Sequence, residues 1–471
     1  MLPMPKNYAI WPGVVPADLP VQMTIAPCER AFMLFEGEEY NLTLIAVNAD
    51  EPSYYVPTAR RKMTVTAHGG CLRFECTFED EQEHLIILEK GETQLGEMFV
   101  YSLRSDLYGL RPMKGDLHSH SYRSDGKRDP AALAGHYREQ GYDFFALTDH
   151  NRFYPGGEID EAYAGVQTGI VRIPGEEVHA PGSVVHIVHV GGKSGVTAQY
   201  VNDPENFERE AAEYLAKVPA DVPARYAERY AKALWATDRI HEDGGIAIFP
   251  HPYWKPGGSK VHNVCDEFAR ILIMSGMFDA YELIGGMGQI GNNRSVALWG
   301  DLRAEGLKIS VVGSSDVHTL EKAYSFPHYF TICFAKDKQA GSVAEAVKAG
   351  LSVAVEAVGD EYARQYRCYG ALRLVSYAQF LLTHYFPQQQ RACQGEGVAM
   401  RAYAMGEADA ALIEVQAAHT ESLRARFFGE EPAVVPSDGI IAFENKWREV
   451  HLQGPLTKGS GLSAPPVTRQ I

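Results

Sequence analysis

Residue types that bind metal ions follow almost every short apolar run between residues 112 and 318. Runs such as 144–147 and 309–312 are almost continuously apolar, which is typical of strands that are covered on both faces. Helical stretches separate the runs, so the pattern predicts βα units around a parallel sheet. The carboxyl ends of such strands meet at one face of an α/β barrel. We therefore expect the following side chains to converge there: Asp116, His118, His120, Asp149, His150, Glu176, Glu177, His179, His186, His189, His251, Asp316 and His318.

The chemistry of these side chains indicates a metal site. Imidazole and carboxylate groups suit zinc, manganese and iron ions. His118 and His120 are two residues apart on an extended segment, so both side chains face the same way. Each motif alone is a weak signal, because His150 could belong to a helix cap and His251 to a packed loop. Their joint occurrence, each at the end of a predicted strand, predicts a hydrolase that uses several metal ions.

The chain divides into four predicted regions. Residues 1–110 contain short strands separated by turn residues, which predicts a β-sandwich. The βα pattern covers residues 111–356. Residues 357–454 are mostly helical in pattern, with helices expected at 361–385 and 406–427 and a connector around 388–397. Residues 455–471 are rich in Gly, Ser and Pro, which predicts a flexible tail.

Charge and composition exclude several classes of function. The net charge of −16 argues against a nucleic-acid partner. The sequence contains no run of eighteen apolar residues, so no membrane span is predicted. The first residues also lack the apolar stretch of a secretory signal. The seven cysteines are scattered and form no CxxC pair, so we expect neither disulfides nor a zinc–thiolate site. These features favour a cytoplasmic protein with a small-molecule substrate; they leave its oligomeric state open.

Five segments of the middle region resemble the motifs of the PHP (polymerase and histidinol phosphatase) family of metal-dependent phosphoesterases and hydrolases. The match spans roughly residues 112–356, and the stretch His251-Pro252-Tyr253-Trp254 further resembles a PHP-like subgroup that includes carbamate and ester hydrolases. The segments are residues 115–121 with Ser124-Asp125-Gly126, residues 146–151, residues 174–178, residues 249–252 and residues 313–318.

This resemblance implies a distorted (β/α)7 PHP barrel that holds two or three divalent ions, Mn, Zn or Fe. Carried over by position, the metal ligands would be His118, His120, Asp125, His150, Glu177, His186, His251, Asp316 and His318. Glu176 competes with Glu177, because neighbours on an extended segment point opposite ways and only one should enter the site; the motif favours Glu177. His186 similarly competes with His189 and with His179. Asp116 and Asp149 would orient the ligating histidines.

The leading functional hypothesis is a phosphoesterase in which a metal-bridging hydroxide attacks phosphorus. Asp316 or a histidine such as His318 would protonate the leaving group. Three cationic residues near the motifs are predicted to bind an anionic substrate: Arg123, Arg152 and Lys255. Hydrolysis of a carbamate, an amide or a carboxyl ester on the same metals is an alternative, which a pocket without cations near the metals would favour. A metal-loaded binding module without catalysis is an alternative of another class.

Overall fold

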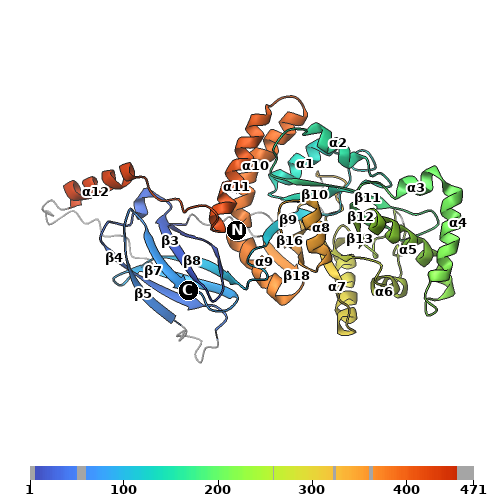
Figure 1. Ribbon diagram of the computed structural model, residues 1–471, viewed down its shortest axis with the longest axis horizontal. Helices are drawn as coiled ribbons and strands as arrows, with labels where there is room; N and C mark the ends of the chain where they lie inside the picture. Colours follow the sequence, from blue (N-terminus) through green and yellow to red (C-terminus); the bar gives the residue numbers. More distant parts are fainter. Residues whose placement is uncertain (1–5, 50–59, 258, 322–324, 360–363, 453–471) are drawn as a thin grey trace. The chain divides into compact units, whose positions relative to one another are not determined.

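The computed structural model describes residues 6–49, 60–257, 259–321, 325–359 and 364–452, which form two compact units (Figure 1). The described residues of 105–425 form one unit. Those of 4–104 and 426–471 form the other. Among the described residues, no helix is long and apolar enough to cross a lipid bilayer.

The unit that contains the N-terminal strands consists of two sheets around one hydrophobic core. Ile25 and Phe74 of the smaller sheet pack with Leu42, Ile86 and Val100 of the larger one. Alternate residues along these strands are buried, as expected for sheets with one covered face. Among the described residues the smaller sheet has the order β1 (Tyr8–Trp11), β3 (Pro20–Pro27), β6 (Leu72–Thr77). The larger has the order β2 (Val14–Pro16), β8 (Thr93–Leu103), β7 (Gln82–Lys90), β4 (Glu39–Ala46), β5 (Arg60–Thr66), and helix α12 (Asp438–Leu452) belongs to the same unit.

The second unit is built on one mixed sheet. Its order in the described chain is β15 (Ser310–Gly313), β14 (Ala280–Ile284), β13 (Gly245–Phe249), β12 (Ile187–Gly191), β11 (Val171–Val178), β10 (Phe144–Leu147), β9 (Arg111–Asp116), β16 (Tyr329–Ala335), β17 (Ser352–Val358), β18 (Gln365–Tyr369). Strands β9–β11 are parallel and so are β13–β15, but β12 runs antiparallel to both of its neighbours. The loop before β12 is too short for a crossover helix, so the strand must reverse. The α/β class is present, whereas the sheet is mixed rather than the expected parallel one.

The sheet curls so that β15, at one end of the strand order, approaches β16 and β17. The Thr331 hydroxyl on β16 accepts a hydrogen bond from Gly313 N at 3.1 Å and donates one to Gly313 O at 2.8 Å. The Ser352 hydroxyl on β17 donates to Val311 O at 2.9 Å. A side chain on Gly313 would place its Cβ 2.6 Å from Phe330 O, so this close approach requires glycine. The curled sheet is therefore barrel-like.

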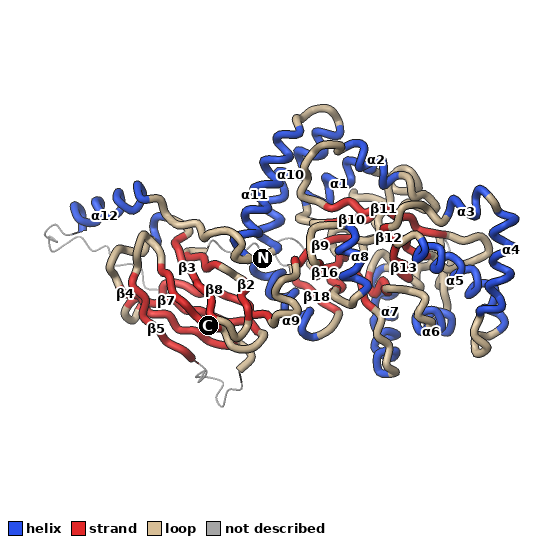
Figure 2. The backbone as a smooth tube through the Cα atoms, in the orientation of Figure 1, coloured by secondary structure: helices blue, strands red, loops and turns tan. Residues whose placement is uncertain are grey.

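Helices surround this sheet (Figure 2). They are α1 (Pro130–Glu139), α2 (Pro155–Ala162), α3 (Thr197–Asn202), α4 (Pro204–Tyr214), α5 (Ala227–Glu242), α6 (Asp266–Met274), α7 (Gly288–Ala304) and α8 (Ala340–Lys348). Helix α1 begins as its sequence predicts: the Asp129 carboxylate accepts a hydrogen bond from Ala132 N at 2.8 Å, and Pro130 occupies the first turn. Buried residues of α8, such as Val343 and Val347, pack against apolar side chains of the strands.

The region after residue 357 differs from its predicted pattern in two places. Strand β18 occupies part of the expected helix 361–385, because its backbone pairs with β17; residues 361–363 lie outside the described residues. The expected connector at 388–397 lies inside a helix. The helices are α9 (Leu372–His384), α10 (Phe386–Ala404) and α11 (Ala410–Phe427).

The glycines that suggested a connector have a packing function. A Cβ on Gly397 would lie 2.3 Å from Glu139 N and 2.5 Å from Gly135 O of α1. A Cβ on Gly135 would lie 2.9 Å from Gly397 O. The two helices, which lie side by side in Figure 1, therefore approach each other through glycine on both sides.

A carboxylate on α11 joins this helix to β9 and predicts a pH dependence of stability. Arg111 donates two hydrogen bonds to Glu421, at 3.0 and 2.6 Å. Burial alone would raise the pKa of Glu421, but the hydrogen bonds and charges of Arg111 and then Arg424 lower it to about 2. A glutamate in the unfolded chain titrates near about 4.3. The stabilisation from Glu421 is thus complete above that pH and is lost as the pH falls towards 2.

We expect Glu421→Gln to lower the free energy of unfolding at pH 7 and to make less difference as the pH falls below about 4. Urea unfolding of both proteins between pH 3 and 7 would measure this difference. The exposed Glu407 provides the control, since its glutamine variant should follow the parent protein at every pH. A constant difference between Glu421→Gln and the parent over that range would contradict the assignment.

Candidate metal centre

Ten histidine and carboxylate side chains converge at one edge of the curled sheet. Four overlapping groups each bring one nitrogen or oxygen per residue within 4.8 Å of the others. All nine ligands expected from the sequence belong to these groups, and His179 is the tenth member. His186 precedes the first residue of β12. Because β12 runs antiparallel, its beginning lies at the edge where β11 and β13 end.

The most buried group combines the His118–His120 pair with Glu177 and Asp316. The two histidine Nε2 atoms are 3.1 Å apart, and His120 Nε2 lies 3.0 Å from Asp316 Oδ1. Glu177 Oε2 lies 3.3 Å from His118 Nε2. Two ligands of one zinc ion, each about 2.0–2.1 Å from it, are separated by about 3.0–3.4 Å. The distances in this group are therefore those of atoms that share one ion.

Glu177 also belongs to a second group, on its other carboxylate oxygen. Glu177 Oε1 lies 2.8 Å from His186 Nδ1 and 3.0 Å from His251 Nε2. A carboxylate with one oxygen in each of two groups is the arrangement that bridges two ions. Glu177 is the residue that connects the centre.

The third group contains Asp125, His150 and His318, with His120 at its boundary. Asp125 oxygens lie 3.4 Å from His150 Nε2 and 3.2 Å from His318 Nε2. This group is more exposed than the other two, because the side chain of Asp125 is 55% exposed. An ion held here would be the one most accessible to solvent.

The residues present fit divalent metal ions. Asp316 Oδ1 is buried and has no aligned hydrogen bond among the described residues, although two histidine nitrogens lie within 3.4 Å of it. His150 Nδ1 is likewise without one, 2.9 Å from Glu177 Oε2. These atoms are close to one another but are not aligned as donor and acceptor. Shared coordination of an ion explains such an arrangement.

The electrostatics of the centre favour cations. Burial opposes a charge on His118, but Asp316, Glu177 and Glu282 outweigh it and raise the pKa of His118 well above its usual range. Burial would raise the pKa of Asp316, yet the charges of the surrounding histidines lower it. The carboxylates therefore attract either protons onto the imidazoles or metal ions that replace those protons.

Glu282 supports the centre and was missed in the sequence. It lies on β14, and its Oε2 is 2.9 Å from His118 Nδ1. A carboxylate on one ring nitrogen fixes the orientation of the imidazole and directs the other nitrogen towards an ion. The available signal was a lone carboxylate within the apolar run 280–284.

Asp116 and Asp149 hold loops rather than histidine rings. Asp116 accepts hydrogen bonds from His118 N at 3.2 Å, Ser315 N at 3.0 Å and the Tyr137 hydroxyl at 2.7 Å. Asp149 accepts from Ser121 N at 2.8 Å. Both carboxylates contact main-chain N–H groups of the loop that carries His118 and His120, so they position these histidines through the backbone rather than through the rings.

The backbone is strained at the ligands. Asp316 has φ 51° and His251 has φ 24°, in a region that non-glycine residues rarely adopt. Asn151, which follows His150, has φ 52°. Each such residue costs about 1–3 kcal/mol and persists where its surroundings enforce it. The loops therefore place these side chains in conformations that the isolated chain would avoid.

The residues that the sequence left as alternative ligands lie on two faces of the sheet. Glu176 points away from the centre, accepting hydrogen bonds from Val196 N and from Thr197 N, the latter at 3.2 Å. His189 accompanies it, with Nδ1 3.5 Å from Glu176 Oε1. His179 lies in the centre instead, stacked on His186 with ring centroids 3.8 Å apart.

The three cations expected to bind substrate are not part of the ligand cluster. Arg123 forms a two-point ion pair with Glu158, at 2.8 and 2.6 Å. Arg152 and Lys255 have exposed side chains, and neither forms an ion pair within the part of the chain that the structure describes. Trp254 lies beside the ligands: its ring centroid is 5.6 Å from that of His186 and 6.0 Å from that of His251.

Comparisons with known proteins find likenesses at the level of structure. No family model matches the chain. No curated protein matches it. A two-domain protein from Bacteroides vulgatus, containing a predicted PHP-like metal-dependent phosphoesterase, is 18% identical with a TM-score of 0.36; the match covers 53% of this chain and 66% of that one, just under two thirds. An amidohydrolase from Chromobacterium violaceum is 20% identical with a TM-score of 0.30, over 45% of this chain and 89% of that one. At this level of similarity neither structure assigns the chain to a family.

Proposed function

We propose that the chain is a metal-dependent hydrolase of phosphate esters. The observation that carries the proposal is the convergence of four overlapping ligand groups, three of which share Glu177. His118, His120, Glu177 and Asp316 would hold one ion; Glu177, His186 and His251 a second; and Asp125, His150 and His318 a third. Bound ions of this kind lower the pKa of water and neutralise charge on a phosphoryl oxygen.

Charge favours an anionic substrate. Three divalent ions carry more positive charge than four carboxylates carry negative charge; these are Asp125, Glu177, Asp316 and Glu282. The occupied centre would thus retain a positive charge that suits a phosphate group, although Arg123 is already paired with Glu158. Arg152 and Lys255 keep their proposed role of binding an anionic substrate.

A side chain of the centre would also donate the proton to the leaving group. Asp316 and His318 are the proposed donors, and the side chain of His318 is 35% exposed, so substrate and solvent can reach it. His179 is a further candidate, because the other nine side chains complete the three groups without it. Its Nε2 forms no hydrogen bond within the described chain.

The test compares two p-nitrophenyl phosphate esters, the monoester and the diester, with manganese present. We expect turnover of at least one, loss of activity with a chelator, and a decrease of about a thousandfold in His118→Ala, because one lost ligand removes several kcal/mol of charge stabilisation. His419→Ala, an exposed histidine on α11, is the matched control. Absence of turnover of both esters by the metal-loaded protein would contradict the proposal.

A second candidate function is hydrolysis of a carboxyl ester, carbamate or amide. The Trp254 ring beside His186 and His251 favours it, because this surface suits an apolar acyl group. The pairing of Arg123 with Glu158 also favours it, because a paired arginine is less available to an anionic substrate. The same assay distinguishes the two, since p-nitrophenyl acetate would then be cleaved with a higher kcat/KM than either phosphate ester, with the same dependence on metal and on His118.

A further inference from the structure

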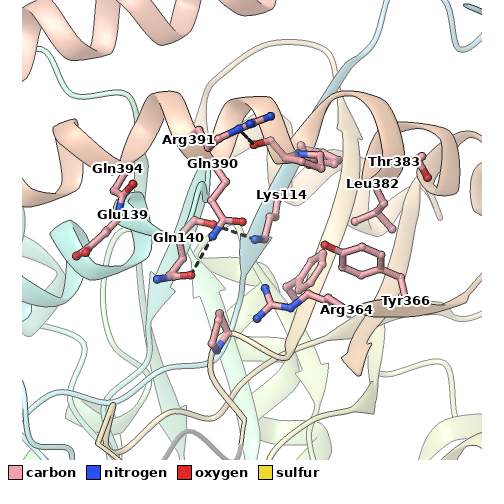
Figure 3. Close-up of a pocket in the computed structure, with 14 residues that line it drawn as sticks. Lys114, Glu139, Gln140, Arg364, Tyr366, Leu382, Thr383, Gln390, Arg391 and Gln394 are labelled. Carbon is pink, nitrogen blue, oxygen red and sulfur yellow. Dashed lines mark hydrogen bonds between the residues drawn. The ribbon is translucent and has the colours of Figure 1, made fainter. Parts of the chain in front are cut away.

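A cavity of about 660 Å³ lies between the C-terminal helices and the sheet, outside the metal-ligand groups. Its walls come from α9, α10, the end of α1, and strands β9, β16 and β18 (Figure 3). Its volume is within the range of about 300–1,000 Å³ that small-molecule sites occupy. None of the ten side chains of the metal centre lines it.

Positively charged groups distinguish this cavity. Lys114 of β9 is buried and donates a hydrogen bond to Gln140 O at 3.0 Å (Figure 3). Its Nζ lies 4.3 Å from the ring centroid of Tyr142. Arg364 also lines the cavity, and its Nε is buried without a hydrogen bond among the described residues. Arg391 of α10 lies at the edge. Burial, and then the charge of Arg364, lower the pKa of Lys114 to about 7.

The nearby carboxylates are engaged elsewhere. Glu139 lines the cavity but lies 2.8 Å from Arg401, with which it forms an ion pair. Asp143 accepts hydrogen bonds from the main-chain N of Lys114 at 3.0 Å and from Gln389 Nε2 at 2.8 Å. Within the described chain, neither the Lys114 ammonium nor the Arg364 guanidinium forms a direct ion pair with a carboxylate, although the charge of Asp143 partly offsets the effect of burial on the pKa of Lys114. Lys114 is buried and Arg364 is half-buried, so an anion bound in the cavity beside them would favour the charged form of Lys114 and offset the cost of its burial.

We propose that this cavity binds a small organic phosphate, at a site separate from the metal centre. Arginine and lysine together suit a phosphate group, the arginine through its forked N–H groups. The volume exceeds the needs of inorganic phosphate alone. Phe330, Tyr366 and Phe386 provide ring surfaces for the organic part, and Gln390 and Gln394 provide amide groups. The ligand would contact β9, the strand that ends just before the His118–His120 pair.

The test uses the full chain and isothermal titration calorimetry with three probes: adenosine 5′-monophosphate, glycerol 3-phosphate and inorganic phosphate. We expect at least one organic phosphate to bind more tightly than inorganic phosphate. Arg364→Gln and Lys114→Met should each weaken that binding about tenfold or more, the effect of removing one charged hydrogen bond. Lys308→Gln, an exposed lysine outside the cavity, should leave the affinity unchanged.

Two further comparisons keep the result specific to the cavity. Binding should persist in His118→Ala, because that substitution affects the metal centre alone. If Lys114→Met fails to fold, the affinity measured for Arg364→Gln still tests the proposal, because Arg364 is partly exposed. The proposal is wrong if none of the probes binds at millimolar concentration, if Arg364→Gln binds as tightly as the parent, or if His118→Ala abolishes the binding.

Discussion

Substitution of Glu177 by glutamine is expected to remove most of the bound metal and to lower kcat by about a thousandfold or more. Its two carboxylate oxygens lie in different ligand groups, at 2.8 Å from His186 and 3.3 Å from His118. A glutamine amide offers one neutral oxygen, so it can serve only one of the two groups, and more weakly. Metal content measured by inductively coupled plasma mass spectrometry, together with kcat on the best substrate, gives both quantities.

The neighbouring residue provides a matched control for this experiment. Glu176 is equally buried, but it faces away from the centre, towards Val196 and Thr197. Glu176→Gln keeps an oxygen that can accept those backbone hydrogen bonds, so we expect near-normal metal content. Equal losses of metal in the two variants would mean that burial of charge, rather than ligation by Glu177, explains the effect.

The largest expected effect on stability comes from the buried ion pair between Arg138 and Glu396. The side chains are 2% and 0% exposed, and Arg138 Nε donates to Glu396 Oε2 at 2.7 Å. Glu396→Ala would leave the buried guanidinium with only the longer contact to Asp143, at 3.5 Å, and breaking a buried pair of this kind costs about 3–5 kcal/mol. Urea unfolding monitored by tryptophan fluorescence should show this loss as a lower midpoint with a similar slope.

Removal of an exposed ion pair and a double substitution of the buried pair are the controls for the stability experiment. Arg209 and Glu213 form an i, i+4 pair on α4 with side chains 59% and 63% exposed, and its removal should cost less than about 1 kcal/mol. Arg138→Met combined with Glu396→Leu should recover part of the loss, since the buried guanidinium is then gone, while Asp143 keeps its hydrogen bonds from Lys114 N and Gln389 Nε2. A Glu396→Ala midpoint equal to that of the exposed-pair variant would show that the pair contributes little.

The candidate site could be located from the sequence because its ligands follow local strand patterns. His118, His150 and His251 each lie just after an apolar strand, and strand ends in one curled sheet meet at one edge. The faces of Glu176 and Glu177 also follow from the alternation of side chains along a strand. These predictions required no knowledge of how distant segments pack.

Features that depend on tertiary contacts could not be predicted in the same way. Glu282 acts through His118, which lies far from it in sequence, so no local pattern reveals its role. The reversal of β12 depends on which strands pair with it. The glycines of α10 suggested a connector because glycine has a low helix propensity. In the structure, a close contact with α1 outweighs that unfavourable propensity. Tertiary packing decided each of these cases.

The spread of the ligands along the chain has a consequence for folding. The centre combines residues from His118 to His318, which lie on or beside six strands, and it exists only once the sheet has curled. A short zinc finger can collect its ligands early, because they lie close together in sequence. In this chain the loop-closure entropy must be overcome by the packed sheet first. If the centre binds metal ions as proposed, their uptake is expected to be a late event that locks a native topology already reached by the polypeptide.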